Sequence, residues 1–170
     1  MTRRSLLKIL GLAPVVGFTA CVGAKDAEAA PATFKSKLSH AEWKKILPPE
    51  SYRVLFEEAT ERAGTSPLND EKREGIYVCA ACYNPLFNAR TKFNSGTGWP
   101  SFFRARPDAI GTKVDNSLFS QRTEYHCAHC GGHQGHVFDD GPAPTGLRYC
   151  NNGVALRFVP EAEPLPALRA

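Results

Sequence analysis

Two C-x-x-C pairs constrain the fold of this 170-residue chain more than any other feature of its sequence. Cys79 and Cys82 form the first pair, and Cys127 and Cys130 form the second. Each pair places two sulfurs on one tight turn, and four thiolates complete a closed tetrahedron with no open position for a substrate. Because 44 residues separate the pairs, a structural Zn²⁺ would join two distant segments and hold the chain between them in register.

Two alternatives remain open for these four cysteines. An oxidising compartment would permit disulfides. A single C-x-x-C can also be a thioredoxin-like redox motif, although neither pair opens a clear helix. Two matched pairs are a more specific signal than one, and this favours zinc.

Cys150 is the cysteine that these pairs leave without a partner, since the sixth cysteine, Cys21, lies near the N-terminus. Arg148 would favour a Cys150 thiolate if it lies close enough, and Asn152 offers an amide that can orient a polar group. These neighbours indicate a nucleophilic thiol. The alternative is a buried and inert cysteine, because free cysteines are commonly buried.

The first 30 residues are predicted to be an export signal. Arg3 and Arg4 begin a segment that resembles a twin-arginine signal, and the apolar run over 9–22 is shorter than the about 20 residues that span a bilayer. Cleavage before Cys21 would leave a lipid anchor, whereas the Ala-Glu-Ala sequence at 27–29 fits ordinary cleavage. Twin-arginine export is understood to carry folded proteins, so the expected location is the periplasm, with a lipoprotein anchored to the membrane as the alternative.

The rest of the chain is nearly neutral. Residues 31–170 carry 17 Lys and Arg against 15 Asp and Glu. Because this segment has no basic cluster and no stripe of alternating aromatic and basic residues, we expect no nucleic-acid partner. Its length suits one domain over 31–159, and the prolines that follow predict a flexible tail over 160–170.

Helices are expected before strands. Ser39 and Glu42 fit a capping box, with Trp43, Ile46 and Leu47 at helical spacing behind it. Pro48-Pro49 ends that helix, and a second short helix is expected over 51–57. The chain has 13 prolines and 14 glycines, which favours short strands, with residues 60–75 as a surface loop. Strands are expected over 76–79, 86–87, 92–93, 117–121, 123–126, 136–138 and 154–158.

Two further segments carry candidate site residues. Trp99 lies among permissive glycines in what should be a loop, although a tryptophan is equally often ordinary core. His133 and His136 follow the second C-x-x-C. Four cysteines already satisfy a zinc ion, so these histidines are free for proton transfer, unless they are exposed or hold purely structural hydrogen bonds.

Taken together, these segments resemble the methionine-R-sulfoxide reductases of the B type. The resemblance rests on the two C-x-x-C pairs, on SGTGWPSFF at 95–103, on GHQGHVFDDGP at 132–142 and on RYCNNGVALRF at 148–158. It implies a mainly β fold of two small antiparallel sheets with short N-terminal helices, stapled by a structural zinc site of four cysteines. It also implies thiol-dependent reduction of methionine-R-sulfoxide, in peptides or proteins, to methionine.

The resemblance assigns five catalytic residues. The Cys150 thiolate would attack the sulfoxide sulfur and become a sulfenic acid. Sulfoxide oxygen leaves poorly unless it receives protons, and His133 and His136 are the candidates to supply them. Arg148 and Asn152 match residues thought to tune the cysteine and the hydrogen bonds around it.

The resemblance assigns the substrate-binding residues as well. Trp99 matches the tryptophan that packs against the methyl group of the substrate, and Phe138 and Phe158 would give apolar support. Selectivity for the R epimer is implied by the family, because each type of reductase handles one epimer of the chiral sulfur.

The sequence departs from the family at two positions. Thr97 stands where many relatives have a resolving cysteine, so the sulfenic acid would be reduced directly by a thioredoxin-like protein or a small thiol, or a zinc-site cysteine would step in. Asn151 replaces the usual branched aliphatic residue, which would loosen local packing. Two rival functions are a zinc-knuckle binding module and a peroxide-reducing thiol enzyme.

Overall fold

The computed structural model describes residues 34–117 and 120–169. The predicted export signal, including Cys21, lies outside these residues. Within them, no helix combines the length and the hydrophobicity that crossing a membrane requires.

Two short helices open the described chain, α1 (His40–Ile46) and α2 (Pro49–Glu57). The predicted capping box is present at α1. The backbone N–H of Ser39 donates to the Glu42 carboxylate at 2.8 Å, and the N–H of Glu42 donates to Ser39 Oγ at 3.4 Å. Pro49 is the first residue of α2, a position where its missing N–H breaks no helical hydrogen bond.

The helices pack through one side only. Trp43 and Leu55 are each 1% exposed, and Trp43 stacks on Phe56 with a ring separation of 5.7 Å. Ile46 is 48% exposed, so its predicted place on the apolar face of α1 is wrong. The helix ends at this residue, and the next residue, Leu47, is the one that enters the core, at 7% exposed.

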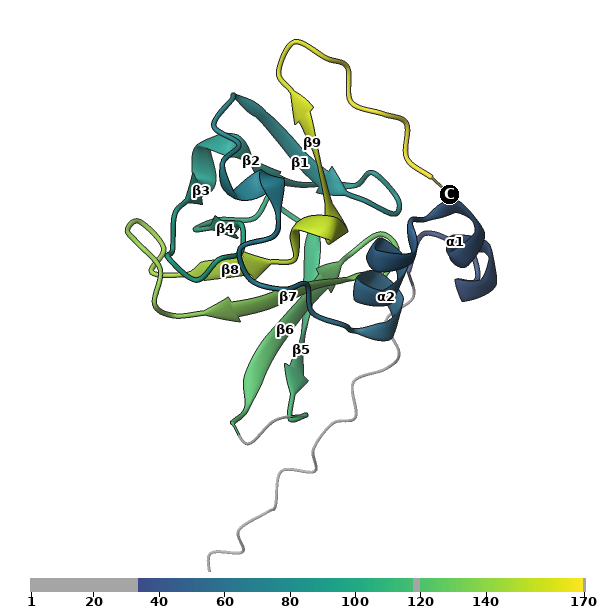
Figure 1. The fold of residues 1–170 in the computed structure, drawn as a ribbon, viewed down its shortest axis with the longest axis horizontal. Coiled ribbons are helices and arrows are strands. Elements are labelled where there is room, and N and C mark those ends of the chain that lie inside the picture. The colour runs from purple at the N-terminus through teal and green to yellow at the C-terminus, as the bar shows by residue number, and fades with distance from the viewer. Residues whose placement is uncertain (1–33, 118–119, 170) are drawn as a thin grey trace, which may run out of the picture. The chain divides into compact units, whose positions relative to one another are not determined.

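In the described part of the chain, nine strands form two antiparallel sheets (Figure 1). This confirms the predicted mainly β fold with short helices. The smaller sheet has the order β2-β1-β9, and the larger has the order β3-β4-β8-β7-β6-β5. The strands are β1 (Gly75–Cys79), β2 (Pro85–Asn88), β3 (Lys92–Phe93), β4 (Ser101–Phe102), β5 (Ile110–Asp115), β6 (Arg122–Cys127), β7 (His133–Phe138), β8 (Arg148–Asn151) and β9 (Leu156–Pro160), with short 3-10 helices η1 (Pro67–Asn69), η2 (Ala89–Thr91) and η3 (Gly153–Ala155).

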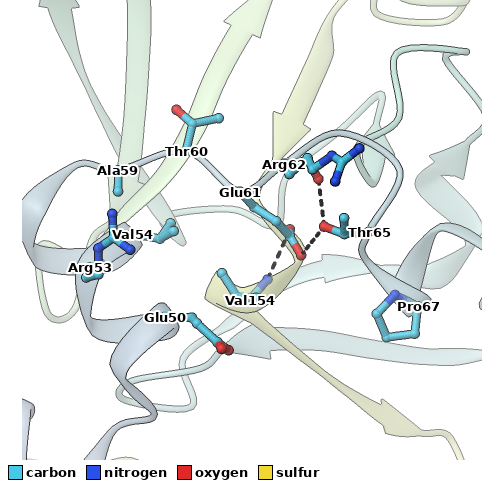
Figure 2. A pocket seen from close by; sticks show the side chains of 10 residues that line it. All are labelled: Glu50, Arg53, Val54, Ala59, Thr60, Glu61, Arg62, Thr65, Pro67 and Val154. Carbon is cyan, nitrogen blue, oxygen red and sulfur yellow. Dashed lines mark hydrogen bonds between the residues drawn. The ribbon is translucent and has the colours of Figure 1, made fainter.

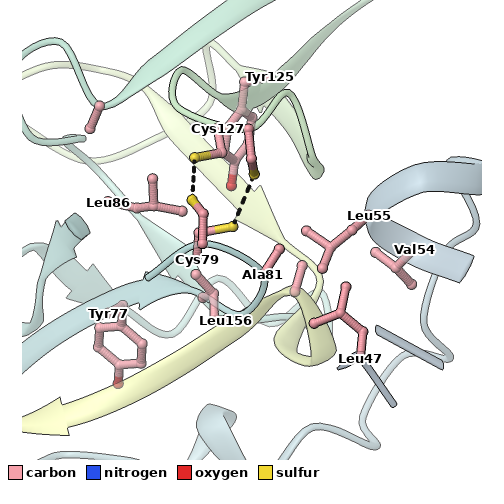
Figure 3. Packing of buried hydrophobic residues seen from close by; sticks show 14 of the residues in the cluster. Leu47, Val54, Leu55, Tyr77, Cys79, Ala81, Leu86, Tyr125, Cys127 and Leu156 are labelled. Atoms are coloured by element: carbon pink, nitrogen blue, oxygen red, sulfur yellow. Dashed lines mark hydrogen bonds between the residues drawn. The ribbon is translucent and has the colours of Figure 1, made fainter. Parts of the chain in front are cut away.

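Aromatic rings join the two sheets in one core. Phe87 of β2 stacks on Phe102 of β4 at 4.2 Å, and Tyr77 of β1 meets Phe102 edge-on at 4.9 Å. Tyr125 of β6 reaches Phe87 at 6.1 Å. All four rings are fully buried, and the cysteines of the two C-x-x-C pairs belong to the same buried cluster (Figure 3). Burial of aromatic surface on this scale is the main stabilising contribution to a domain of this size.

Some strand boundaries differ from expectation. The strand predicted over 117–121 is wrong for its described residues, because β5 occupies Ile110–Asp115 and a turn follows it. The consecutive residues Thr112, Lys113 and Val114 of β5 are exposed, so both faces of its centre meet solvent, which removes the alternation that reveals a half-buried strand. The strand expected over 154–158 begins only at Leu156, since the backbone first makes the turn of η3.

The segment 160–170, for which a flexible tail was expected, begins inside β9, which ends at Pro160. Near its end, the backbone N–H of Arg169 donates to the carbonyl of Cys82 at 3.0 Å. The Arg169 guanidinium also lies 4.1 Å from the centre of the Tyr83 ring. The C-terminal segment therefore returns to the turn that carries the first C-x-x-C pair.

Candidate active site

The four cysteines of the C-x-x-C pairs come together as a metal site. Their sulfurs all lie within 4.8 Å of one another, and all four residues are buried. The Cys79 and Cys130 sulfurs are 3.7 Å apart, and those of Cys82 and Cys127 are 3.5 Å apart (Figure 3). These separations approach the about 3.8 Å edge of a tetrahedron with 2.3 Å metal–sulfur bonds. They are far longer than the roughly 2.05 Å of a disulfide bond.

Neighbouring amides complete the metal site. Asn84 Nδ2 donates to Cys127 Sγ at 3.5 Å, and Gln134 Nε2 donates to Cys79 Sγ at 3.4 Å. Such donors stabilise the negative charge of thiolate ligands. The residues therefore fit a tetrahedral metal ion held by four thiolates, as the spacing of the two pairs predicted.

Cys150 lies in the middle of the larger sheet. On β8 it faces Ser101 of β4 on one side and His136 of β7 on the other. The approach of β7 is so close that a Cβ atom on Gly135 would lie 1.9 Å from the Cys150 carbonyl oxygen. The sequence therefore needs glycine at position 135 for the cysteine and the histidine to sit side by side.

The Cys150 side chain opens into a small pocket of about 120 Å³. The thiol is partly buried, in contrast to the inert buried cysteine that was the alternative interpretation. The pocket combines a flat apolar wall with polar and basic groups. It is lined by Thr60, Trp99, Arg122, Gly135, His136, Phe138, Cys150, Asn151 and Asn152.

Two opposing effects act on the Cys150 thiol. Burial raises its pKa above the ordinary value of a cysteine, and this effect dominates. Hydrogen bonding to Thr97, whose Oγ1 lies 4.0 Å from the sulfur, works in the other direction, as do the charge of Arg148 and the hydroxyl of Ser101. Arg148 is thus close enough to favour the thiolate, but it does not overcome the burial.

Arg148 divides its charge between two partners. Its guanidinium donates to both oxygens of the Asp140 carboxylate, at 2.8 and 2.9 Å. The same group lies over the Phe138 ring, 4.2 Å from its centre. A bidentate carboxylate and an aromatic face hold the guanidinium rigidly, and the carboxylate offsets part of its pull on the cysteine.

His136 is the histidine that reaches the pocket. Its Nε2 lies 2.7 Å from Asp115 Oδ2, and Asp115 also accepts from Arg122 at 2.6 Å and from the backbone N–H of Ser117 at 2.9 Å. Burial lowers the pKa of His136, and the Asp115 carboxylate opposes this by stabilising the imidazolium. Hydrogen bonds from Ser117, His136 and Arg122 hold the pKa of Asp115 well below its usual range.

His133 lies behind His136 and does not line the pocket. It is 4% exposed, and its ring centre is 5.6 Å from that of His136. Its Nδ1 is 3.0 Å from Glu124 Oε1, at ion-pair distance but without the alignment of a hydrogen bond. Burial raises the pKa of Glu124, whereas His133 and Lys113 together lower it by more. The pKa therefore lies below its ordinary value, and the carboxylate stays charged.

Trp99 and Asn152 are tied together through Glu61. The Trp99 Nε1–H donates to the Glu61 carbonyl at 2.9 Å, and Asn152 Oδ1 accepts from the Glu61 N–H at 2.9 Å. Asn152 Nδ2 donates in turn to the Gln134 carbonyl at 3.0 Å. Asn152 therefore fixes the loop that supports Trp99 and does not present its amide to the pocket alone.

Phe158 is the predicted substrate-binding residue that the structure does not bring to the pocket. It lies on β9 of the smaller sheet, with its ring 5.0 Å from Tyr77 and with the guanidinium of Arg73 5.2 Å away. Asn151 also differs from expectation, because it is fully buried and well paired. It accepts from the Tyr125 hydroxyl at 2.7 Å and donates to the Asn152 carbonyl at 2.8 Å, so the packing around it is not loosened.

Several residues that build this site were not predicted from the sequence. Thr60 and Glu61 belong to a segment interpreted as a surface loop, and Asp115 ends a strand that was not predicted. Glu124 was inside a predicted strand and Arg122 lay between two predicted strands, and neither was given a role. Their contacts join residues far apart in the sequence, so no local sequence pattern predicts their roles.

Comparisons with known proteins agree with this geometry. The SelR domain matches residues 47–160. A protein of Methanosarcina barkeri named peptide methionine sulfoxide reductase MsrB is 52% identical over 126 residues, which cover 74% of this chain and 89% of the relative. A protein of the same name from Agrobacterium fabrum is 50% identical over 127 residues, 74% of this chain and 94% of the relative. A third, from Pseudomonas putida, is 50% identical over 120 residues, 70% of this chain and 92% of the relative. The chain therefore belongs to the SelR-domain family of peptide methionine sulfoxide reductases.

Proposed function

We propose that this protein reduces methionine-R-sulfoxide in peptides to methionine, with Cys150 as the nucleophile. The observation that carries the proposal is the pocket itself. It places one partly buried thiol beside one imidazole and one indole ring, in a space that suits a single side chain. Membership of the family supports the same reaction.

In the first step, the Cys150 sulfur bonds to the sulfoxide sulfur; the sulfoxide S–O bond then breaks as the oxygen bonds to the Cys150 sulfur, and the new S–S bond breaks as methionine leaves. The sulfoxide gains two electrons, Cys150 loses two, and the thiol becomes a sulfenic acid that keeps the proton. His136 is the general acid for the oxygen, because it lines the pocket next to the cysteine. Asp115 occupies its Nε2, which leaves Nδ1 for the proton transfer. His133 positions the His136 ring from behind.

The substrate methyl group would lie against Trp99 and Phe138. Both rings line the pocket, and each is fixed from outside, Trp99 by the Glu61 carbonyl and Phe138 by the Arg148 guanidinium. A rigid apolar wall opposite a proton donor distinguishes a methyl group from an oxygen on the same sulfur. This arrangement supports selection of one epimer, and the family implies that it is the R epimer.

The Cys150→Ser variant tests the nucleophile. A serine hydroxyl is a far weaker nucleophile than a thiolate, so reduction of dabsylated methionine-R-sulfoxide with dithiothreitol should fall by roughly 1000-fold or more. Product formation is followed by chromatography, and wild-type protein with hydrogen peroxide in place of the sulfoxide tests the peroxidase alternative. Activity that survives the substitution and disappears on chelation would point to metal catalysis.

We propose that Zn²⁺ is the metal held by Cys79, Cys82, Cys127 and Cys130, and that its role is structural. Four thiolates leave no coordination position open, so zinc supplies cross-linking and not catalysis. Metal analysis should find one zinc per chain in both the wild type and Cys150→Ser. A structural zinc contributes an apparent about 10–16 kcal/mol, comparable to the whole stability of a domain. Removal by chelator should therefore abolish the near-UV circular dichroism, whereas a metal-free protein that melts like the original would contradict the structural role.

We propose that an external thiol, from a thioredoxin-like protein or a small molecule, regenerates Cys150. Within the described residues, every other cysteine belongs to the metal cluster. The external thiol would bond to the Cys150 sulfur and release water, and a second thiol would then free Cys150 as a thiol and form the external disulfide.

One turnover without reductant tests this route. Wild type should yield one methionine per chain and a Cys150 sulfenic acid that dimedone traps, detected by mass spectrometry. Thr97→Cys is the matched variant, because Thr97 Oγ1 already lies 4.0 Å from Cys150 Sγ. It should form an internal disulfide and lose the dimedone adduct. An internal Cys150 disulfide in the wild type would refute direct reduction.

The Asp115→Asn variant tests the support of His136. Burial already lowers the His136 pKa, and the Asp115 charge opposes that effect. Without this charge the imidazolium is less stable, so the His136 pKa should fall further, and the positive charge should be lost at lower pH. An NMR titration of the ring protons measures the shift, with the exposed Asp139→Asn as a control. An unchanged or raised pKa would show that Asp115 does not stabilise the imidazolium.

A further inference from the structure

A second cavity, larger than the pocket at Cys150, adjoins it. Its volume is about 450 Å³, against about 120 Å³ for the catalytic pocket. We call it the α2 groove, because residues of α2 form one of its sides (Figure 2). It is lined by Glu50, Arg53, Val54, Ala59, Thr60, Glu61, Arg62, Thr65, Pro67 and Val154.

The groove and the catalytic pocket share a wall. Thr60 lines both cavities. The next residue, Glu61, lines the groove with its side chain, while its backbone accepts from Trp99 and donates to Asn152, which both line the pocket. A chain that leaves the pocket past Thr60 therefore enters the groove.

The floor of the groove is held in place before any ligand arrives. The Glu61 carboxylate accepts from the backbone N–H groups of Gly153, at 2.6 Å, and Val154, at 3.4 Å. The Thr65 hydroxyl donates to the Arg62 carbonyl at 2.6 Å, closing the turn (Figure 2). Binding to such a surface requires little ordering of the protein.

The charged side chains of the groove differ in whether they have a partner within the protein. The negative charge of Glu61 is directed at backbone donors of η3. Arg53 and Arg62 are exposed, and within the described residues neither guanidinium makes an ion pair or a side-chain hydrogen bond. The two lining glutamates, Glu50 and Glu61, equal the two arginines in number, but Glu61 is held by the backbone, so two exposed arginines and one exposed glutamate remain to meet a ligand.

We infer that the α2 groove binds the polypeptide on one side of the oxidised methionine, and that Arg53 and Arg62 favour acidic residues there. This rests on the proposed function. A free methionine sulfoxide would occupy only the pocket of about 120 Å³, whereas the groove has the size of a ligand site in its own right. Continuity with the pocket and the two exposed, unpaired arginines point to acidic substrate polypeptide as the occupant.

The test compares two blocked peptides that carry one methionine-R-sulfoxide, flanked on both sides by aspartates in one and by lysines in the other. Dithiothreitol is the reductant, so no partner protein is present. In low salt, wild type should reduce the acidic peptide with a kcat/KM about fivefold higher, the scale expected of two exposed ion pairs. The preference should shrink as salt screens the charges.

The double variant Arg53→Glu/Arg62→Glu should invert the ratio of the two peptides. The ratio is an internal reference, since damage to the fold would slow both peptides alike. The control is Arg104→Glu/Arg106→Glu, which makes the same change of charge at exposed residues outside the groove and should keep the wild-type ratio.

N-acetyl-methionine-R-sulfoxide, which is too small to reach the groove, distinguishes a failure of the proposed function from a failure of the assignment of the groove. If wild type does not reduce this compound, the proposed function itself fails. If it does, and the two peptides react equally, or the acidic preference persists in Arg53→Glu/Arg62→Glu, the assignment of the groove is wrong. If Arg53→Glu/Arg62→Glu changes the rate only when a thioredoxin-like protein is the reductant, the arginines bind the reductant and not the substrate. That outcome would overturn the inference as well.

Discussion

The meeting of four sulfurs from two distant turns is the constraint on which the rest of the structure depends. One turn follows β1 of the smaller sheet, and the other joins β6 to β7 of the larger sheet. The metal site therefore fastens the two sheets to each other. Gln134, which donates to a cluster sulfur, is also the residue whose carbonyl holds Asn152 beside the pocket. The position of Cys150 thus depends in part on the cluster of four sulfurs, through Gln134 and Asn152.

The active site is a consequence of strand pairing. Because β7 and β8 are antiparallel and in register at His136 and Cys150, the proposed acid and the proposed nucleophile become neighbours without any loop having to place them. The sheet also buries the thiol, which raises its pKa and makes the resting protein less reactive towards chance electrophiles. The nearby Arg148 works against this effect, because its positive charge lowers the pKa of the Cys150 thiol.

Local signals in the sequence predicted what is local in the structure. The capping box at Ser39, the C-x-x-C turns and the strands around them follow from short-range spacing, and the structure confirms them. β4 has only two residues and carries no periodicity, and the central residues of β5 are exposed on both faces, so neither strand was predicted, although the two-residue β3 was. Phe158 was assigned by resemblance alone, and its strand belongs to the other sheet. Glu61 and Asp115 act through hydrogen bonds across the fold, which only the assembled sheets reveal.

Asn151 illustrates how one polar residue in a core restricts the drift of a sequence. Its amide is shared among the Tyr125 hydroxyl, the Gln134 side chain and the carbonyl of Asn152. An aliphatic residue there would leave the buried tyrosine hydroxyl without a hydrogen-bond partner, which would lower the free energy of unfolding by about 1–3 kcal/mol. An aliphatic side chain at position 151 should therefore be tolerated best when position 125 also loses its hydroxyl, so substitutions at these two positions are expected to occur together.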